Sequence, residues 1–289
     1  MMRLLRLLVV LVFIIGCAMG GYTKYQSMQT IENSSPVITI EEDTLRVSCS
    51  ATREDLLQGV TASDAEDGDL TSEIIIENAS NFIEPGRCRI YYAVFDSAGK
   101  VAAASRTLIY EDYTSPAISL TEPLTFTAGS TVSVLDKIRV EDCIDGDISS
   151  SAEVMSSTVK STVSGVYRVK IRVSNSHGDM VTLELPVVIS DAKDQDLVLT
   201  LDTPVLRLHT GDSFNADSHL TGAKDASGNT VSLYRTKTEE HNANVNVSGS
   251  VSTDTPGVYY ITYTVIDDNA HRGTAVLTVI VDGEEEIPG

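Results

Sequence analysis

The sequence predicts an all-β protein in which three tandem β-sandwich domains follow an N-terminal hydrophobic segment. The first observation behind this prediction is a repeat: TASDAEDGDLTSEI at residues 61–74 returns as RVEDCIDGDISSSAEV at residues 139–154. A repeat of this length is typical of an array of similar small domains. The second observation is that each copy leads to a glycine followed by alternating apolar residues, which is the pattern of a β-strand.

The composition supports the same class of fold and excludes one class of partner. The 289 residues are enough for two or three domains of ordinary size. The chain has no Trp, and its many Val, Ile, Thr and Ser residues are typical of short strands. Lys plus Arg number 21 against 41 Asp plus Glu, which gives a net charge of −20. Because this charge repels phosphate backbones, we expect no nucleic acid partner.

Residues 1–21 read as an export or anchor segment, in which Arg3 and Arg6 precede a long apolar run. Two outcomes remain open for it. The sequence IIGC resembles a bacterial lipobox, in which Cys17 is lipidated after cleavage. Alternatively, residues 4–21 stay whole as a single-pass helix with the basic flank in the cytoplasm. Complete release by an ordinary signal peptidase is a third outcome, and all three place the remaining residues outside the cytoplasm.

The expected localisation is therefore the cell membrane, with the N-terminus as the anchor and the domains on the extracytoplasmic side. A strand-like segment opens each domain, and these segments recur about eighty residues apart, which is the size of a small β-sandwich. Short polar linkers join the domains and predict a semi-extended row. The predicted divisions are a stalk at 22–34, sandwich domains at 35–110, 115–190 and 197–282, and an acidic tail at 283–289.

Inside each domain the sequence predicts a β-hairpin near the carboxyl end. A glycine opens an alternating strand, turn residues follow it, and a final apolar strand closes the copy. The opening glycines are Gly86, Gly165 and Gly257, and the turn pairs are Asp96 with Gly99, Asn175 with Gly178 and Asp268 with Gly273. Within the domains one helix is predicted, over residues 51–60, where Thr52 is suited to cap its first turn.

These motifs are similar to those of a known family, the bacterial Ig-like domain first described in a pesticidal crystal protein, which is related to hyaline-repeat domains. The matching residues are Asp64, Asp67, Gly68 and Asp69 in the first copy, Asp142, Asp145, Gly146, Asp147 and Tyr167 in the second, and Tyr259 in the third. Cys88 stands where the tyrosine of the first copy is expected, and the third copy has only AKDASGNT, at 223–230, near the place of the acidic motif. The resemblance implies three tandem Ig-like sandwiches, a fold that serves many unrelated functions.

The acidic motif offers closely spaced oxygen ligands around a glycine that permits a sharp turn. Calcium prefers roughly six to eight hard oxygen ligands, so the motif is a candidate calcium site. The alternative is a tight turn whose carboxylates bind local backbone amides, and this turn chemistry alone accounts for the residue types. The candidate ligands are Asp64, Glu66, Asp67, Asp69, Asp142, Asp145 and Asp147.

The cysteines of the first domain also leave two alternatives open. In an Ig-like sandwich the strands that carry Cys49 and Cys88 can approach each other, so an exported chain could join them by a disulfide. Two partly buried thiols are the other interpretation, because the sequence does not give the Cα separation that a disulfide needs. Cys143 has no equivalent partner.

The sequence shows none of the familiar catalytic motifs; paired carboxylates of the kind that hydrolyse glycosides stay open, but Asp-rich motifs repeated in two copies fit a structural element better than a unique active site. The five histidines form no HExxH pair, no Gly-x-Ser-x-Gly elbow appears, and no Walker loop or GxGxxG follows a strand. We therefore expect no enzyme activity, no catalytic residues and no cofactor other than the candidate calcium.

The function that follows is that of a non-enzymatic, membrane-anchored bacterial cell-surface protein whose Ig-like modules serve adhesion, binding or spacing. Its expected partners are the membrane, through the N-terminus, and a surface glycan or protein. The alternative is an accessory ligand-binding subunit of an envelope complex. The third copy is the most divergent and carries a polar excursion at 233–249, so binding is predicted there.

Overall fold

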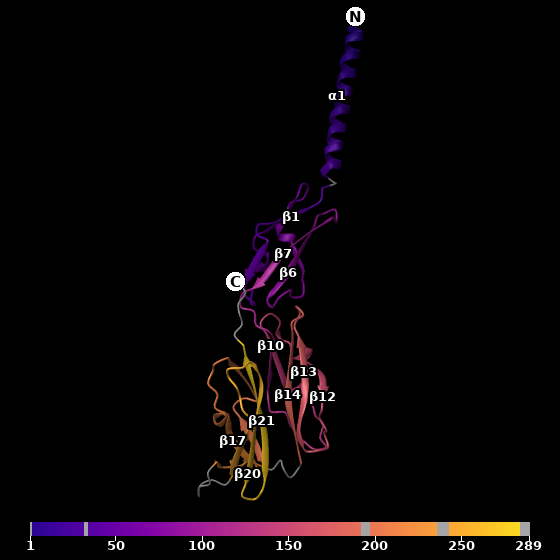
Figure 1. Ribbon diagram of the computed structural model, residues 1–289. Coiled ribbons are helices and arrows are strands. Elements are labelled where there is room, and N and C mark those ends of the chain that lie inside the picture. The colour runs from indigo at the N-terminus through magenta and orange to yellow at the C-terminus, as the bar shows by residue number, and fades with distance from the viewer. Residues whose placement is uncertain (1, 32–33, 192–196, 236–242, 284–289) are drawn as a thin grey trace. The chain divides into compact units, whose positions relative to one another are not determined.

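The computed structural model describes residues 2–31, 34–191, 197–235 and 243–283. After one long helix the chain consists mainly of short strands, and it forms two compact units, residues 1–114 and 115–289 (Figure 1). This confirms the predicted all-β class with tandem Ig-like sandwiches. Most of the tail predicted at 283–289 and the middle of the polar excursion at 233–249 lie outside the described residues.

The N-terminal segment is a single helix, α1 (Met2–Ile31). It contains the apolar run and continues through most of the residues predicted as a stalk. Residues 22–31 contain neither Pro nor Gly, so no residue among them breaks the helix. Among the residues that the structure describes, no helix has the length and hydropathy that a membrane span requires.

The first sandwich, residues 37–110, consists of two sheets with strand orders β1-β3-β4 and β2-β7-β6-β5. Its strands pair antiparallel, apart from the parallel pair β2 with β7. The elements are β1 (Val37–Ile40), β2 (Thr44–Val47), α2 (Arg53–Leu57), β3 (Val60–Asp64), β4 (Gly68–Asp69), η1 (Thr71–Glu73), β5 (Ile75–Ala79), β6 (Arg87–Phe95) and β7 (Val101–Tyr110). Side chains that are almost wholly buried form its core, namely Ile74, Cys88, Ile90, Tyr92, Val94 and Leu108.

Helix α2 confirms the one helix predicted within the domains. Thr52 is its N-cap and forms a capping box with Asp55. The Asp55 N–H donates to Thr52 Oγ1 at 3.3 Å, and the Thr52 N–H donates to Asp55 Oδ2 at 2.8 Å. The hydrogen bond from the Thr52 amide, followed by that from its hydroxyl, lowers the pKa of Asp55.

The second sandwich, residues 117–190, repeats this arrangement with sheets β11-β10-β8 and β12-β13-β14-β9. Its elements are β8 (Ala117–Leu120), β9 (Thr125–Thr127), η2 (Leu135–Lys137), β10 (Ile138–Asp142), β11 (Gly146–Asp147), η3 (Ser149–Ser151), β12 (Glu153–Ser157), β13 (Gly165–Ser174) and β14 (Met180–Ser190).

The third sandwich, residues 197–282, has sheets β15-β17 and β16-β21-β20-β19-β18. Its elements are β15 (Leu197–Leu201), β16 (Val205–His209), η5 (Ala216–Ser218), β17 (Leu220–Asp225), β18 (Leu233–Tyr234), β19 (Ala243–Ser248), β20 (Gly257–Asp267) and β21 (Arg272–Asp282). As in the other two sandwiches, a parallel pair, here β16 with β21, closes one edge of the larger sheet.

The three predicted hairpins are present as β6–β7, β13–β14 and β20–β21. The first two turns use the predicted residues. The Gly99 N–H donates to the Asp96 carbonyl at 3.1 Å, and the Gly178 N–H donates to the Asn175 carbonyl at 3.1 Å. Both glycines have a positive φ, as a left-handed turn position requires.

The third turn corrects the prediction. It runs from Asp267 to His271, and Ala270, with φ 67°, takes the place of the turn glycine. Gly273 lies in β21 instead, where an added Cβ would be 2.5 Å from the carbonyl oxygen of Leu197. The prediction failed because this glycine serves close backbone packing, which the sequence does not distinguish from a turn.

The second and third sandwiches belong to one compact unit and pack against each other, which corrects the predicted semi-extended row for this pair of domains. Their closing strands β14 and β21 are buried on both faces along much of their length, whereas the closing strand β7 of the first sandwich shows partial alternation. The segments LPVVIS and AVLTVIVD are nearly continuous apolar runs, which are typical of strands covered on two faces. The apolar side chains on the outer faces of β14 and β21 therefore explain why the second and third sandwiches pack against each other.

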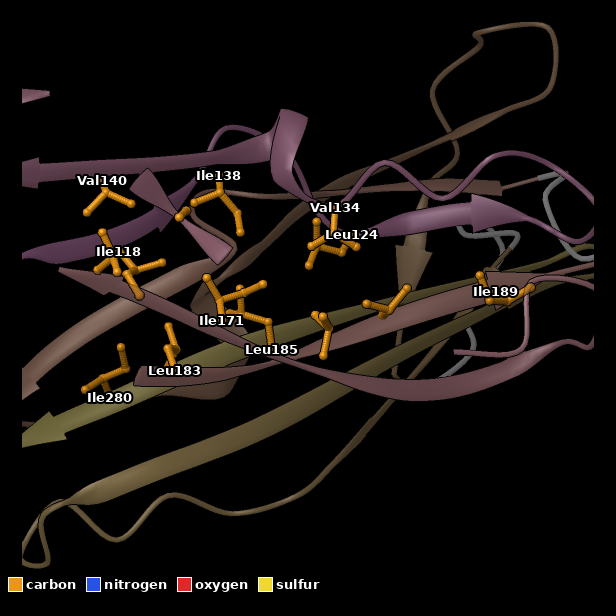
Figure 2. Close-up of a cluster of buried hydrophobic side chains, with 14 residues drawn as sticks. Ile118, Leu124, Val134, Ile138, Val140, Ile171, Leu183, Leu185, Ile189 and Ile280 are labelled. Atoms are coloured by element: carbon orange, nitrogen blue, oxygen red, sulfur yellow. The ribbon is translucent and has the colours of Figure 1, made fainter. Parts of the chain in front are cut away.

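Two sets of contacts join these sandwiches. Ile280 of β21 is 8% exposed and belongs to the hydrophobic cluster of the second sandwich (Figure 2). The guanidinium carbon of Arg168 lies 3.7 Å from the ring centroid of Tyr260, which is the geometry of a cation–π contact. The Tyr260 hydroxyl donates to the Glu184 carbonyl oxygen at 2.8 Å.

Candidate functional site

The aspartate loop of the first sandwich connects β3 to β4. Asp64 is 9% exposed, and its Oδ1 accepts hydrogen bonds from the backbone N–H groups of Glu66 at 2.8 Å and Asp67 at 3.3 Å. The Glu66 amide makes the largest contribution to a lowered pKa of Asp64. Gly68, with φ 75°, completes the turn in a conformation that other residues rarely adopt. This geometry is the tight turn that the sequence analysis gave as the alternative to a calcium site.

The same loop also holds the chain that leads into the sandwich. The Ser34 hydroxyl lies 2.9 Å from both carboxylate oxygens of Asp64. Lys100 Nζ donates to the Ser34 carbonyl oxygen at 2.6 Å, and Asp67 Oδ2 accepts from the Ser97 N–H at 2.7 Å. Lys100 and Ser97 belong to the β6–β7 turn, so the loop connects the start of the sandwich to its hairpin.

The second sandwich has an equivalent loop. Asp142 is 5% exposed, and its Oδ1 accepts from the N–H groups of Ile144 and Asp145, both at 2.9 Å. Asn175 Nδ2 donates to Asp142 Oδ2 at 3.1 Å. Asp145 accepts from the Ser176 N–H at 2.7 Å and from the Ser176 hydroxyl at 2.8 Å. Asp145 therefore binds the β13–β14 turn as Asp67 binds the β6–β7 turn, and Asp142 adds a second hydrogen bond to that turn.

The last aspartate of each motif lies two residues before a short 3₁₀ helix and binds its first residue. Asp69 accepts from the Thr71 N–H at 2.9 Å, and Asp147 accepts from the Ser149 N–H at 3.0 Å and from its hydroxyl at 2.5 Å. The hydroxyl of Thr71 or Ser149 is the largest cause of the lowered pKa of each aspartate. The remaining predicted ligand, Glu66, is exposed.

These loops thus give most of their carboxylate oxygens to amide and hydroxyl donors. Across the residues that the structure describes, no group of three or more His, Cys, Asp or Glu side chains is arranged to hold a metal ion. Calcium binding at the seven acidic residues stays a prediction. In the first sandwich the geometry provides a latch that joins the start of the sandwich to its hairpin turn, and the second sandwich repeats the link to the hairpin turn; we call this arrangement the aspartate latch.

The third sandwich has a local turn near the expected place of the motif. Asp225 Oδ1 accepts from the N–H groups of Ser227 at 2.9 Å and Asn229 at 2.8 Å, and Asn229 Nδ2 donates to Asp225 Oδ2 at 2.9 Å. These donors lower the pKa of Asp225, and the Asn229 side chain contributes most. The hydrogen bonds described for Asp225 remain within its own turn, so the latch of the other two sandwiches is not repeated at this residue.

No disulfide joins Cys49 to Cys88 among the residues that the structure describes. Cys49 follows β2 and Cys88 lies in β6, and the sheet order places β7 between these strands. Two strand steps separate them by about 10 Å, whereas the Cα atoms of a disulfide are at most about 7 Å apart. The sandwich therefore keeps the two thiols apart.

The two thiols have different surroundings. Cys88 is fully buried opposite Leu108, and burial raises its pKa to about 11. The backbone N–H of Cys49 donates to Asp112 Oδ1 at 2.7 Å. Asp112 has a lowered pKa, mainly because the Ser48 hydroxyl also donates to it. A residue beyond the closing strand is thereby bound to the turn after β2.

On α1, the predicted lipidation residue Cys17 is exposed. The apolar side chains that precede it are also exposed, namely Leu11 at 59%, Val12 at 60%, Phe13 at 70%, Ile14 at 57% and Ile15 at 51%.

Sequence reasoning missed a buried arginine. Arg106 of β7 is 3% exposed, and its Nε donates to the Tyr92 hydroxyl at 2.9 Å. Its Nη2 donates to the carbonyl oxygens of Leu56 at 3.2 Å and Gln58 at 2.7 Å, at the end of α2. Counted from the glycine that opens each hairpin, the equivalent residues in the other sandwiches are buried leucines, Leu185 and Leu277. Alignment of the closing strands could have revealed this exception.

Comparisons with known proteins agree with the motif analysis. Residues 227–281 match the family model described as bacterial surface protein, Ig-like domain. The chain is 25% identical over 290 residues to the pesticidal crystal protein Cry22Aa of Bacillus thuringiensis, and the match covers 95% of this chain and 37% of that protein. The chain thus spans well under half the length of this relative.

Solved structures give weaker similarities. One, titled as CBM51-2 in complex with GlcNAc and INT domains from Clostridium perfringens ZmpB, is 17% identical over 86% of this chain and 42% of that chain, with a TM-score of 0.23. Another, Drosophila N-cadherin EC1-4, is 12% identical over 87% of this chain and 76% of that chain, with a TM-score of 0.22. The family match and the Cry22Aa similarity support a bacterial Ig-like surface-domain family for this chain.

Proposed function

We propose that this chain is a non-enzymatic bacterial surface protein, held to the membrane by its N-terminal segment, whose Ig-like sandwiches serve adhesion or binding. The match to a bacterial surface Ig-like domain supports exposure outside the cell and a binding role. Asp64, Asp67, Asp142 and Asp145 form the aspartate latch, so we assign the repeated motif no catalytic part.

The proposal of a membrane anchor rests on the exposed apolar surface of α1. Five consecutive side chains, residues 11–15, are between 51% and 70% exposed. Apolar surface in water costs roughly 25 cal/mol per Å², and a lipid environment removes that cost. The basic residues Arg3 and Arg6 precede the apolar run, as is typical of a segment that enters the export pathway.

Two routes lead to this anchor, and Cys17 distinguishes them. If IIGC is processed as a lipobox, Cys17 becomes the N-terminal residue and its acyl chains carry the attachment. More than one acyl chain is needed for stable attachment, because a single chain binds membranes only marginally. If the segment is not cleaved, α1 itself provides the attachment.

The experiment compares the wild-type chain with Cys17→Ser in a bacterial host. Both are labelled with radioactive palmitate, the membranes are separated, and the mature N-terminus is identified by mass spectrometry. Lipidation predicts label in the wild type and none in Cys17→Ser, and an uncleaved anchor predicts unlabelled protein in the membrane fraction for both. Wild-type protein found only in the soluble fraction would refute anchoring.

The adhesion role is tested on cells that display the full chain. Binding to a glycan array and to immobilised surface extracts is measured before and after residues 236–242, the centre of the polar excursion, are replaced by a Gly-Ser segment of equal length. The proposal expects binding that falls at least tenfold on replacement. Unchanged binding would show that residues 236–242 do not form the binding site. If neither form bound, the adhesion role would be contradicted.

A further inference from the structure

Two buried polar groups lie where the second and third sandwiches pack against each other. Thr278 of β21 is fully buried, and its hydroxyl oxygen has no hydrogen-bond partner among the residues that the structure describes. The same holds for Nη1 of Arg168 in β13, which is buried although the residue as a whole is only half-buried. Buried polar groups without partners are rare in proteins, and each one requires an explanation.

Tyr260 brings these two groups to the same part of the contact. The guanidinium carbon of Arg168 lies 3.7 Å from the centroid of the Tyr260 ring. Thr278 is directly opposite Tyr260 in the β20–β21 ladder, so the two side chains share one face of the sheet, with Cβ atoms about 5 Å apart. That face is the outer one, because the neighbouring residues Leu277 and Val279 belong to the core of the third sandwich. It is the face that packs on the second sandwich.

The charge of Arg168 has no acidic partner in this contact. A guanidinium group stays protonated in proteins, and a buried charge is costly unless it is paired. Within the described part of the chain Arg168 forms no ion pair, whereas Arg172 in the same strand pairs with Glu153 at 2.8 Å. The cation–π contact with Tyr260 offsets only part of the cost. The guanidinium group is therefore left without a counter-ion.

The first sandwich has an arginine at the same position in a different environment. Arg89 is, like Arg168, the third residue after the glycine that opens the hairpin, but it is exposed and its Nη2 donates to the Ser105 hydroxyl at 2.9 Å. In the second sandwich Glu184 stands where Ser105 would be. Glu184 is exposed, and Arg168 lies over Tyr260 instead of forming an ion pair with it.

The surroundings of Tyr260 are dry and offer few acceptors. Burial is the main cause of the raised pKa of Tyr260; the charge of Glu184 adds to this shift and that of Arg168 opposes it. The Tyr260 hydroxyl already donates to the Glu184 carbonyl oxygen at 2.8 Å. Pro186, opposite Arg168, and Ile280, two residues after Thr278, are buried and have no polar side-chain atoms. An acceptor for the two groups has to come from outside the chain.

We propose that Arg168 and Thr278 bind a small inorganic anion of the halide type, such as chloride, between the second and third sandwiches. Arg168 Nη1 and the Thr278 hydroxyl each donate a hydrogen bond to it. A halide ion accepts hydrogen bonds from several donors and also neutralises the guanidinium charge, which a water molecule does not. The bound ion stabilises the packing of the two sandwiches, and the proposal does not depend on the membrane anchor or on the adhesion role.

The first test is thermal unfolding of the full chain in detergent micelles, followed by circular dichroism. Sodium chloride, sodium bromide and sodium gluconate are compared at equal ionic strength, because any salt screens the repulsion within a chain of net charge −20. Gluconate is too large for a site between packed strands. We expect a higher midpoint in chloride and bromide that rises with their concentration, as for any ligand that binds the folded state. Equal midpoints in the three salts would mean that ordered water satisfies both groups, and would overturn the proposal.

Four variants locate the ion. Arg168→Gln removes the charge, so we expect the halide dependence to disappear. Thr278→Val removes the hydroxyl at nearly constant size and should weaken halide affinity roughly tenfold, the effect of losing one hydrogen bond to a charged group. Glu184→Gln should strengthen affinity, because it removes a nearby negative charge. The control Arg172→Gln, which changes the ion-paired arginine of the same strand, should keep the wild-type response. A response that survives Arg168→Gln would place the ion elsewhere and overturn the assignment.

Chlorine-35 NMR gives a second measurement that needs no unfolding. We expect the folded wild-type chain to broaden the chloride resonance, and added bromide to reverse the broadening by competition. Thr278→Val, with circular dichroism showing that its fold is intact, should broaden the resonance less. Broadening that is absent in the wild type, or that is equal in Thr278→Val and the wild type, would contradict the proposal.

Discussion

At the repeated aspartates, single side chains determine the shape of the backbone. Asp64 and Asp142 each accept two amide hydrogen bonds within their own loop and at least one further hydrogen bond from another segment. Buried carboxylates are stabilised by such donors, since a charge without partners in the interior is costly. The latch therefore explains why aspartate recurs at these positions even without a metal ion.

Removal of calcium tests the other interpretation of these residues. If the latch alone holds the loops, the melting temperature of the chain is the same with calcium and with a chelator, because a ligand that does not bind cannot shift the folding equilibrium. Differential scanning calorimetry at several calcium concentrations measures this. A midpoint that rises with calcium, and that no longer does so in Asp145→Asn, would establish a calcium site.

Ala270 gives a second prediction at the scale of one residue. A non-glycine residue in the left-handed region costs about 1–2 kcal/mol, and glycine adds roughly 0.5–1 kcal/mol of conformational entropy to the unfolded chain. We therefore expect Ala270→Gly to stabilise the third sandwich by about 0.5–1 kcal/mol, measured by urea unfolding.

The control for this prediction is Gly273→Ala in the neighbouring strand. Its new Cβ would meet the Leu197 carbonyl oxygen at 2.5 Å, so we expect it to destabilise the same sandwich. If Ala270→Gly proves neutral or destabilising, the turn does not hold position 270 in the conformation described.

Among the elements, α2 depends on a residue far away in the sequence. The helix has only one turn, and isolated helices of that length are unstable in water. The capping box holds its start, while Arg106 binds the carbonyl oxygens of Leu56 and Gln58 at its end. A cation at the carboxyl end of a helix also interacts favourably with the helix dipole. The local capping box and the long-range contact with Arg106 thus both stabilise α2.

Substitution of Arg106 tests this account. Arg106→Leu introduces the residue type found at the equivalent positions of the other sandwiches, yet we expect it to destabilise the first sandwich by about 2–3 kcal/mol, because the partly buried carbonyl groups of Leu56 and Gln58 lose a charged donor. Thermal unfolding of the full chain followed by circular dichroism measures the change. Tyr92→Phe, which removes only the hydroxyl, should cost less, and a neutral Arg106→Leu would mean that the guanidinium group does not support α2.

For the molecule as a whole, the main finding concerns the second unit. Its two sandwiches share buried surface because β14 and β21 have apolar residues on both faces. Thr278, which is fully buried in β21, is one of the few polar side chains there. Packing of this kind makes two domains resist bending, since relative motion would expose apolar area. The unit should therefore unfold in one cooperative transition.

A double-mutant cycle on Arg168 and Tyr260 tests the coupling. Arg168→Ala and Tyr260→Ala are compared with the double variant by chemical unfolding of the full chain. We expect an interaction energy of about 0.5–2 kcal/mol, the range of a cation–π contact at a partly desolvated site. As a control, Arg172→Ala in the same strand should show no coupling to Tyr260→Ala. Additive effects of the first pair would mean that the two sandwiches do not hold each other through this contact.

The sequence alone determined the class of fold, because strand alternation, turn residues and the acidic repeat are local patterns. It also determined the three hairpins and α2, where the cap and the turn chemistry lie within a few residues. Even the misplaced third turn is a local ambiguity, since Ala270 and Gly273 are only three positions apart.

Only the tertiary structure decided which distant residues meet. The sheet order separates Cys49 from Cys88, Arg106 reaches α2, and the outer faces of β14 and β21 bury each other. The separation of two residues along the chain does not predict these contacts, because strands that pair need not be neighbours in the sequence. The sequence shows the continuous apolar runs of β14 and β21, and it shows Arg106 where the other sandwiches have leucine. Their structural roles follow only once the faces that are covered by other elements are known.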